Sequence, residues 1–267
     1  MPQAEINGAE LNYELAGEGP AVVLVHEGVC DLRMWDELFR VLADEFTVLR
    51  YDLRGYGDST LPPGPFSQSG DLLALLDHTG IDRAALVGVS YGGRVALDTA
   101  FVAPDRVTRL VLASAGLREF ESSPELREFG DEEERLLDAG DIDGATDLNV
   151  RLWVDGPNRG PDPVREEVRD RVREMQRRAF EIQVPAYEAQ PPPGPEDPVS
   201  LRLSEVRAPA LVVVGDADVP DFVRIAETLE TELPKVRKVV LEDTAHTIPL
   251  ERPDEFRELV LGFLRER

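Results

Sequence analysis

The sequence Leu86-Val87-Gly88-Val89-Ser90-Tyr91-Gly92-Gly93 joins an apolar run to a Gly-Val-Ser-Tyr-Gly pentapeptide. This pattern predicts a buried strand, a sharp turn that presents Ser90, and a helix. Glycines two residues to either side of the serine fit such a turn, because side chains there would collide with neighbouring elements. The pentapeptide alone is a weak signal, since a chain of this composition contains it by chance about one time in twenty. Ser90 is therefore a candidate nucleophile whose partners must lie elsewhere.

Further short apolar runs are typical of strands covered by helices on both sides. They lie at residues 21–25, 47–51, 109–113, 210–214 and 238–241, in addition to the run at 84–87. The first 16 residues alternate apolar and polar side chains around Asn7-Gly8, which predicts a hairpin. Helices are expected between the strands, at 33–44, 69–79 and 93–102. The alternation predicts an α/β fold with a mostly parallel central sheet of about eight strands and helices on both faces.

The strand pattern stops between residues 117 and 200, where the chain is charged and helical. The apolar face of a long amphipathic helix is indicated by side chains that recur every three or four residues: Val164, Val168, Val172, Met175, Ala179 and Ile182. We expect residues 117–200 to form a helical cap inserted into an α/β core made of residues 1–116 and 201–267. A proline-rich run at 191–198 predicts a stiff, extended linker at the end of this insertion.

Composition limits the function classes. The chain has 267 residues, of which 42% are apolar and 31% charged, as in an ordinary folded protein. Its net charge of -24 opposes binding to phosphate backbones and anionic lipids, so we expect neither nucleic acid nor a membrane as a partner. No apolar stretch approaches the length of a membrane span, and no leader pattern is present, which favours a cytoplasmic protein. Cys30 is the single cysteine and excludes an intramolecular disulfide.

A serine hydroxyl is a poor nucleophile unless a base activates it and a third group orients that base. His246 is the candidate base, because it follows the last expected strand, at the edge of the sheet where loops converge. We expect His26 to brace a loop and His78 to lie at a solvated helix end. Two carboxylates, Asp216 and Asp218, follow the strand at 210–214 and compete for the orienting role; we favour Asp218.

The chain order Ser90, Asp218, His246 is that of the α/β-hydrolase superfamily, which the sequence resembles over nearly its whole length outside the insertion. Residues 51–59, Tyr-Asp-Leu-Arg-Gly-Tyr-Gly-Asp-Ser, resemble the family's Asp-x-Arg-Gly-x-Gly-x-Ser loop. His246 and the segment 250–256 resemble its terminal histidine and Glu-x-Pro-x-x-Phe pattern. The resemblance supports Asp218 as the orienting acid, since the family commonly uses the second aspartate of a Gly-Asp-x-Asp loop.

The resemblance also implies an oxyanion hole. One donor would be the backbone N–H of Tyr91, and the other would come from the loop after the first core strand. Gly28 is the better second donor and Val29 the alternative. Glu27 departs from the family's His-Gly-x pattern: we expect it to point away into a salt bridge, or else to line the pocket and disfavour anionic substrates. Cys30 is expected to be a small packing residue.

Other residues of the resembling segments receive structural roles. Asp52 and Arg54 are expected to tie loops together near the elbow, and Trp35 to lie in the core. Cap side chains shape the substrate pocket in the family, although packing within the cap is the simpler expectation for each candidate: Trp153, Met175, Phe180 and Tyr187.

These features predict a capped serine hydrolase that cleaves a small-molecule carboxylic ester, thioester or lactone through an acyl-enzyme on Ser90. No metal or organic cofactor is expected, because the histidines are few and scattered and no Gly-rich nucleotide loop is present. In this family, epoxide hydrolases and haloalkane dehalogenases need an aspartate at the elbow, so Ser90 argues against both of these activities. The alternatives are a carbon-carbon bond hydrolase, a cofactor-free haloperoxidase or a hydroxynitrile lyase with the same triad, and a non-catalytic binder of a small ligand.

Overall fold

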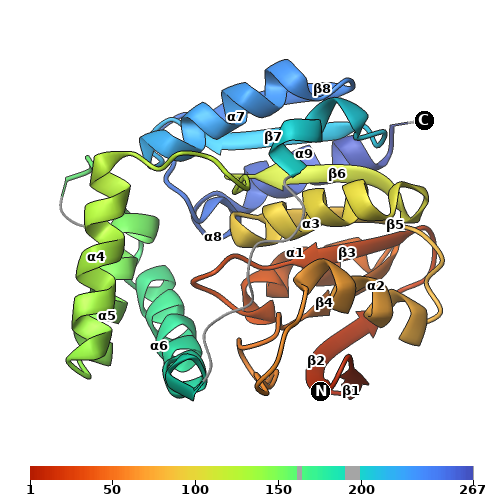
Figure 1. Cartoon of the computed structure of the whole chain (residues 1–267). Coiled ribbons are helices and arrows are strands. Elements are labelled where there is room, and N and C mark those ends of the chain that lie inside the picture. Colours follow the sequence, from red (N-terminus) through yellow and green to blue (C-terminus); the bar gives the residue numbers. More distant parts are fainter. Residues whose placement is uncertain (161–163, 190–198, 267) are drawn as a thin grey trace.

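The computed structural model describes residues 1–160, 164–189 and 199–266. Within them one sheet of eight strands has the order β1-β2-β4-β3-β5-β6-β7-β8 (Figure 1). The β1-β2 and β2-β4 pairs are antiparallel, and the other pairs are parallel. The predicted hairpin and the mostly parallel sheet are therefore confirmed. The strands are β1 (Gln3–Ile6), β2 (Ala9–Ala16), β3 (Ala21–Val25), β4 (Thr47–Tyr51), β5 (Ala84–Val89), β6 (Val107–Ala113), β7 (Ala210–Gly215) and β8 (Val236–Leu241).

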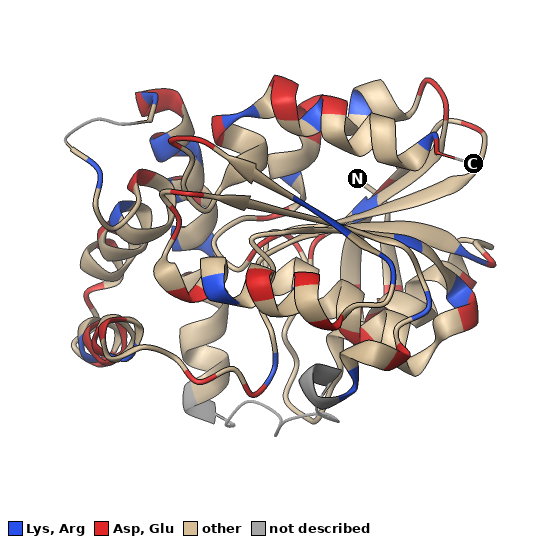
Figure 2. Cartoon of the chain, turned by 90° about the horizontal axis from the view of Figure 1, so that it is seen from above, with Lys and Arg blue, Asp and Glu red and all other residues tan. Residues whose placement is uncertain are grey.

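Helices cover both faces of this sheet. Because successive side chains of a strand point to opposite faces, Val22 and Leu24 of β3 join one apolar core, and Val23 and Val25 join the other. The first core is closed by α1 (Asp36–Leu42) and α9 (Pro253–Leu264), and the second by α2 (Gln68–His78), α3 (Tyr91–Val102) and α7 (Pro220–Glu232). Figure 2 shows charged residues along the outer helices, whereas the strands carry few. The expected helix at 33–44 is a 3-10 turn, η1 (Leu32–Trp35), followed by α1.

A helical insertion lies between β6 and β7 and stands to one side of the sheet (Figure 1). The described part of the insertion contains α4 (Pro124–Asp138), α5 (Ile142–Asn149), a π-helical turn η3 (Val150–Asp155) and α6 (Glu166–Ala189), and η4 (Val199–Glu205) leads back to β7. The predicted apolar face of α6 is buried from Val168 to Ala179, and Ile182 is half-buried. The proposed linker at 191–198 lies outside the described residues, and the cap limits at 117 and 200 stay a prediction.

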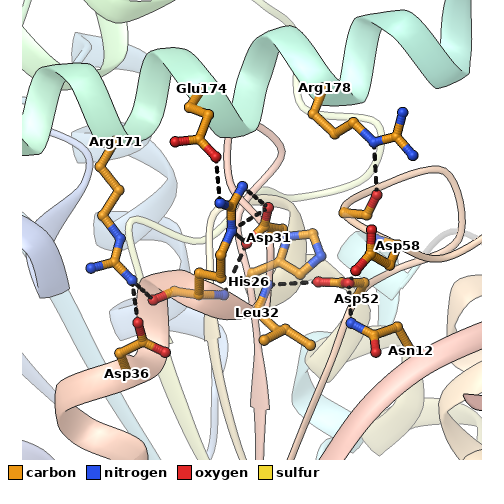
Figure 3. Close-up of polar contacts among 12 residues, drawn as sticks. Asn12, His26, Asp31, Leu32, Asp36, Asp52, Asp58, Arg171, Glu174 and Arg178 are labelled. Atoms are coloured by element: carbon orange, nitrogen blue, oxygen red, sulfur yellow. Dashed lines mark hydrogen bonds and ion pairs between the residues drawn. The ribbon is translucent and has the colours of Figure 1, made fainter. Parts of the chain in front are cut away.

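The helix α6 is tied to the core by charged side chains (Figure 3). Arg171 pairs with Asp36 of α1 at 2.5 Å, and Glu174 pairs with Arg33 of η1 at 2.6 Å. One turn further on, Arg178 donates to a backbone carbonyl in the loop after β4 at 3.2 Å. The insertion therefore rests on the loops that follow β3 and β4. In the part of the chain that the structure describes, no helix has both the length and the apolar composition needed to cross a membrane.

Candidate active site

Ser90 occupies a strained turn between β5 and α3. Its φ of 52° and ψ of -114° lie in a region that residues other than glycine rarely adopt. A Cβ atom on Gly88 would lie 2.3 Å from the carbonyl oxygen of Gly92, and one on Gly92 would lie 2.2 Å from that of Val25. The two glycines therefore let the turn close on itself and against the end of β3, as the pentapeptide predicts.

His246 and Asp218 form a buried pair in the loops that follow β8 and β7. The Nδ1 atom of His246 lies 2.9 Å from Oδ1 and 3.2 Å from Oδ2 of Asp218. Because an ionised carboxylate only accepts hydrogen bonds, Nδ1 carries the proton and Nε2 is left as the basic atom. A Cβ atom on Gly215 would meet the carbonyl oxygen of Thr244 at 1.9 Å, so glycine lets these two loops touch. The competing carboxylate, Asp216, is exposed.

Aromatic rings enclose the His246 side chain. The Trp153 ring, from η3 of the insertion, lies with its centroid 4.7 Å from the imidazole centroid. The Phe222 ring, from α7, stands edge-on at 4.3 Å. The indole N–H of Trp153 donates to the Oδ1 atom of Asn149 at 3.0 Å, which fixes the orientation of the indole ring. The imidazole is therefore held by the core on one side and by the insertion on another.

The electrostatic surroundings of His246 favour its charged form. Burial opposes the imidazolium, but the charge and the hydrogen bond of Asp218, together with the charge of Glu27, outweigh it. The pKa of His246 is consequently raised above its ordinary value. A proton arriving on this ring is stabilised by two carboxylates.

The residues expected to form an oxyanion hole lie side by side. Tyr91 is the first residue of α3, and N–H groups in the first turn of a helix have no acceptor within that helix. A Cβ atom placed on Gly28 would lie 3.8 Å from Cβ of Tyr91 and 3.7 Å from the hydroxyl of Tyr56, so the loop after β3 runs directly past the elbow. The alternative donor, Val29, has a buried side chain.

The other two histidines take the structural places expected of them. His26 is fully buried, donates from Nδ1 to the carbonyl oxygen of Glu27 at 2.7 Å, and accepts the N–H of Leu53 on Nε2 at 2.9 Å. Burial lowers the pKa of His26 to about 4, so the ring is neutral at pH 7 and joins the loops after β3 and β4. His78 is exposed at the end of α2.

Asp52 and Arg54 also join loops near the elbow (Figure 3 shows Asp52). The carboxylate of Asp52 accepts the N–H of Leu32 at 2.8 Å and that of Asp58 at 2.9 Å. Its burial raises the pKa of Asp52 to about 6. Arg54 pairs with Asp71 at 2.8 Å, and both side chains are buried. The contact of Asp52 with Leu32 holds the loop after β4 against the segment that follows β3, and the Arg54–Asp71 pair ties the same loop to α2.

The first expectation for Glu27, an outward salt bridge, is wrong. Its side chain is completely buried, and within the described residues no arginine or lysine pairs with it. Its Oε1 atom accepts the S–H of Cys30 at 3.2 Å, and burial raises the pKa of Glu27 to about 7. Its charge interacts with those of His246 and Asp218. Glu27 points inward because the segment after β3 is itself buried, with His26 and Cys30 on either side of it out of contact with solvent. Cys30 is buried, as expected for a packing residue.

The remaining residues named from the sequence differ in how deeply they are buried. Met175 and Phe180 are buried within the insertion, Tyr187 is exposed, and Trp35 is buried against Phe256. Of the cap residues named from the sequence, Trp153 contacts the His246 ring. The described residues contain no group of three or more His, Cys, Asp and Glu side chains arranged to hold a metal ion.

Sequence reasoning gave no role to Phe222 or Glu251. Phe222 belongs to an ordinary amphipathic helix, and no local signal marks its contact with His246. Glu251 accepts the N–H of Ala245, the residue before His246, at 2.8 Å and pairs with Arg159 of the insertion at 2.7 Å. The position of Glu251 in the Glu-x-Pro segment was the sequence signal that could have pointed to this role. Through Glu251, the backbone beside the histidine is linked to the insertion.

A parallel sheet with a strained serine after β5 and a His–Asp pair after β7 and β8 defines the class of α/β hydrolases. The chain belongs to the alpha/beta hydrolase family, whose family model matches residues 22–259. It is similar to the crystal structure of an enol-lactonase from Burkholderia xenovorans LB400, with 28% identity, a TM-score of 0.81 and coverage of 99% of this chain and 100% of that one.

Two further comparisons agree with this membership. A thermophilic esterase from Thermogutta terrifontis is 28% identical, with a TM-score of 0.82 and coverage of 99% of this chain and 98% of that one. The dihydrolipoyllysine-residue acetyltransferase component of the acetoin cleaving system of Pseudomonas putida is 31% identical over 99% of this chain and 69% of that protein. The family thus includes relatives named for different reactions on acyl groups.

Proposed function

We propose that this protein is a serine hydrolase that cleaves a small-molecule carboxylic ester, thioester or lactone through an acyl-enzyme on Ser90. The observation that carries the proposal is the buried 2.9 Å contact between His246 and Asp218. It lies in loops at the carboxyl edge of the same sheet whose strand β5 ends at Val89, just before Ser90. A base with a fixed tautomer near an elbow serine is the arrangement that acyl transfer requires.

The mechanism follows from the roles of these groups. His246 Nε2 takes the proton from Ser90 Oγ as that oxygen attacks the carbonyl carbon. The resulting oxyanion accepts hydrogen bonds from the N–H groups of Tyr91 and Gly28, which contribute several kcal/mol of transition-state stabilisation. The imidazolium returns its proton to the departing alcohol oxygen. Water, deprotonated by the same ring, then hydrolyses the acyl-enzyme and restores the serine.

Similarity supports the substrate class. Solved structures that this chain resembles include an enol-lactonase and an esterase, whose names refer to lactone and ester substrates. A thioester is included in the proposal because its cleavage would pass through the same acyl-enzyme on Ser90. Glu27 adds a negative charge close to the proposed base, so we expect uncharged acyl groups to be preferred over anionic ones.

Labelling with a fluorophosphonate tests the nucleophile. Intact-mass analysis is expected to show one adduct on the wild-type protein and none on Ser90→Ala. Absence of an adduct, or an adduct that survives Ser90→Ala, would overturn the proposal.

A chain-length series of activated esters and lactones tests the substrate class, with Ser90→Ala and His246→Ala as controls. Hydrolysis that varies with acyl length and is lost in both variants is expected. Flat, very low activity across the series would instead favour the carbon-carbon hydrolase, haloperoxidase, lyase or binding alternatives.

A further inference from the structure

Glu27 is a buried acid that pairs with no arginine or lysine among the described residues. Its side chain is 0% exposed, and its Oε2 atom has no hydrogen-bond partner in the described part of the chain. Its Oε1 atom accepts a hydrogen bond from the thiol of Cys30, which is a weak donor. Burying a carboxylate under these conditions is costly unless a positive charge lies nearby. The proposed mechanism gives this group no part in any of its steps.

The loop that carries Glu27 brings it to the reacting edge of the sheet. Glu27 precedes Gly28, whose Cα is near the side chain of Tyr91, and the charges that Glu27 meets are those of His246 and Asp218. Its own loop contributes the thiol of Cys30, and the neighbouring His26 is neutral at pH 7 because burial lowers its pKa to about 4.

Of the groups that interact with the Glu27 carboxyl, His246 is the one that becomes positively charged during the reaction. It does so each time it takes the proton from Ser90 or from water. The rings of Trp153 and Phe222 cover the imidazole, so solvent contributes little to stabilising that charge.

We propose that Glu27 is a positioning residue whose carboxylate, together with Asp218, stabilises the imidazolium that forms on His246. This rests on the proposed function, in which His246 is the base. No bond to Glu27 forms or breaks: the proton moves from Ser90 Oγ to His246 Nε2, and the two carboxylates balance the new charge from different loops. Asp218 fixes the tautomer through Nδ1, and Glu27 adds charge without a direct hydrogen bond.

The proposal predicts a coupled titration. The pKa of Glu27 is raised to about 7 by burial, and the charges of Glu27 and His246 each favour the ionised form of the other, so the two titrations are coupled. Replacing the carboxylate by an amide removes one of the two charges that raise the pKa of His246. Glu27→Gln is therefore expected to lower the pKa of His246 by about one pH unit.

Nuclear magnetic resonance of the full chain labelled with 15N-histidine measures this directly. Three histidines give a simple spectrum, in which His26 stays neutral at pH 7 and exposed His78 serves as an internal control. Assignment uses His246→Asn. In Glu27→Gln the His246 titration is expected to move to lower pH, and Glu27→Asp should restore part of the difference. A His246 titration that is the same in the wild type and in folded Glu27→Gln would overturn the proposal.

A second variant covers the case in which Glu27→Gln does not fold. Cys30→Ala removes the hydrogen bond that favours ionised Glu27, so the carboxyl is protonated up to a higher pH. The His246 titration should again move to lower pH. An unchanged titration in Cys30→Ala would count against the proposal in the same way.

Kinetics provide a second readout. Because the base must be neutral in the free enzyme, the acidic limb of kcat/KM should move to lower pH in Glu27→Gln by the same amount as the titration. At high pH kcat should fall up to about tenfold with KM little changed, since one pKa unit corresponds to a tenfold change in equilibrium. The titration needs no substrate, so failed fluorophosphonate labelling would refute hydrolysis without affecting the electrostatic result, and the reverse also holds.

Discussion

The indole of Trp153 lies against the imidazole of His246, with 4.7 Å between ring centroids and 46° between ring planes. Trp153 belongs to the insertion, whereas His246 follows the last strand of the sheet. A residue of the cap thus contacts the proposed base directly. It limits the positions that the imidazole can adopt and also excludes water from one of its faces.

Trp153→Ala should impair catalysis by leaving the imidazole free to shift. A misplacement of about 1 Å costs about 100-fold in rate, so we expect kcat to fall 10- to about 100-fold. Trp153→Phe is the matched control, because it keeps an aromatic ring against His246 but loses the hydrogen bond to Asn149. Steady-state kinetics on one activated ester distinguish the variants; equal losses in both would show that the ring contact is not what matters.

Asp218→Asn should abolish most activity while leaving the fold intact. An amide N–H would donate to Nδ1 of His246 and so stabilise the wrong tautomer, which in a comparable triad costs about 10,000-fold in kcat. Asp216→Asn is the control, since Asp216 is exposed in the same loop. Comparable losses of kcat in the two variants would contradict the assignment of Asp218.

The strained turn at Ser90 predicts a trade between stability and activity. A residue held at an unfavourable φ costs about 1–3 kcal/mol, and glycine avoids that cost at the price of a more flexible unfolded chain. Ser90→Gly should be more stable than Ser90→Ala by about 1 kcal/mol, and both should be inactive. Urea unfolding of the two variants measures the difference, and an Ala variant that equals or exceeds the Gly variant would argue against strain.

His26 should make stability depend on pH. Its pKa is about 4 in the folded protein and near 6.5 when unfolded, so the unfolded chain binds more protons between these values. Its contribution is fully present above pH 6.5 and is lost as the pH falls toward 4. Between pH 7.5 and 5 the wild type should lose about 2 kcal/mol more than His26→Gln.

Glu27 acts in the opposite direction over part of this range, because its raised pKa favours the folded state at lower pH. It is present in both proteins of the comparison, so its contribution cancels in the difference. Urea unfolding at the two pH values is the measurement. Identical pH dependence in the wild type and His26→Gln would show that His26 is not held neutral by the fold.

Local patterns were sufficient to predict the architecture. The apolar run at 84–87 and the pentapeptide after it are contiguous in sequence, so the strand, the strained turn and α3 could be read directly. Asp218 and His246 could be selected as partners of Ser90 because all three follow strands of the predicted parallel sheet, and loops after parallel strands meet at one edge. The Gly-Asp-x-Asp pattern favoured Asp218 over Asp216 from the sequence, and the structure places Asp218 against His246 and leaves Asp216 exposed.

The packing around His246 could not be predicted from the sequence. Trp153 and Phe222 come from elements far apart in the chain, and their contacts depend on how the insertion settles on the core. Glu27 shows the same limit: a charged residue in a loop is usually solvated, and only the path of the loop after β3 buries it. The helix boundaries near η1 also differ from the single helix predicted at 33–44. A 3-10 turn and an α-helix share the same apolar pattern, so the sequence could not distinguish them.

The link from Arg159 through Glu251 to the N–H of Ala245 has a consequence for protein engineering. Exchanging the cap of this protein for that of a relative would change more than the shape of the substrate cavity. It would also remove the guanidinium that restrains the histidine loop, together with the indole that covers the imidazole. A successful chimera would have to carry an arginine and an aromatic residue equivalent to these two, or supply new supports for the base.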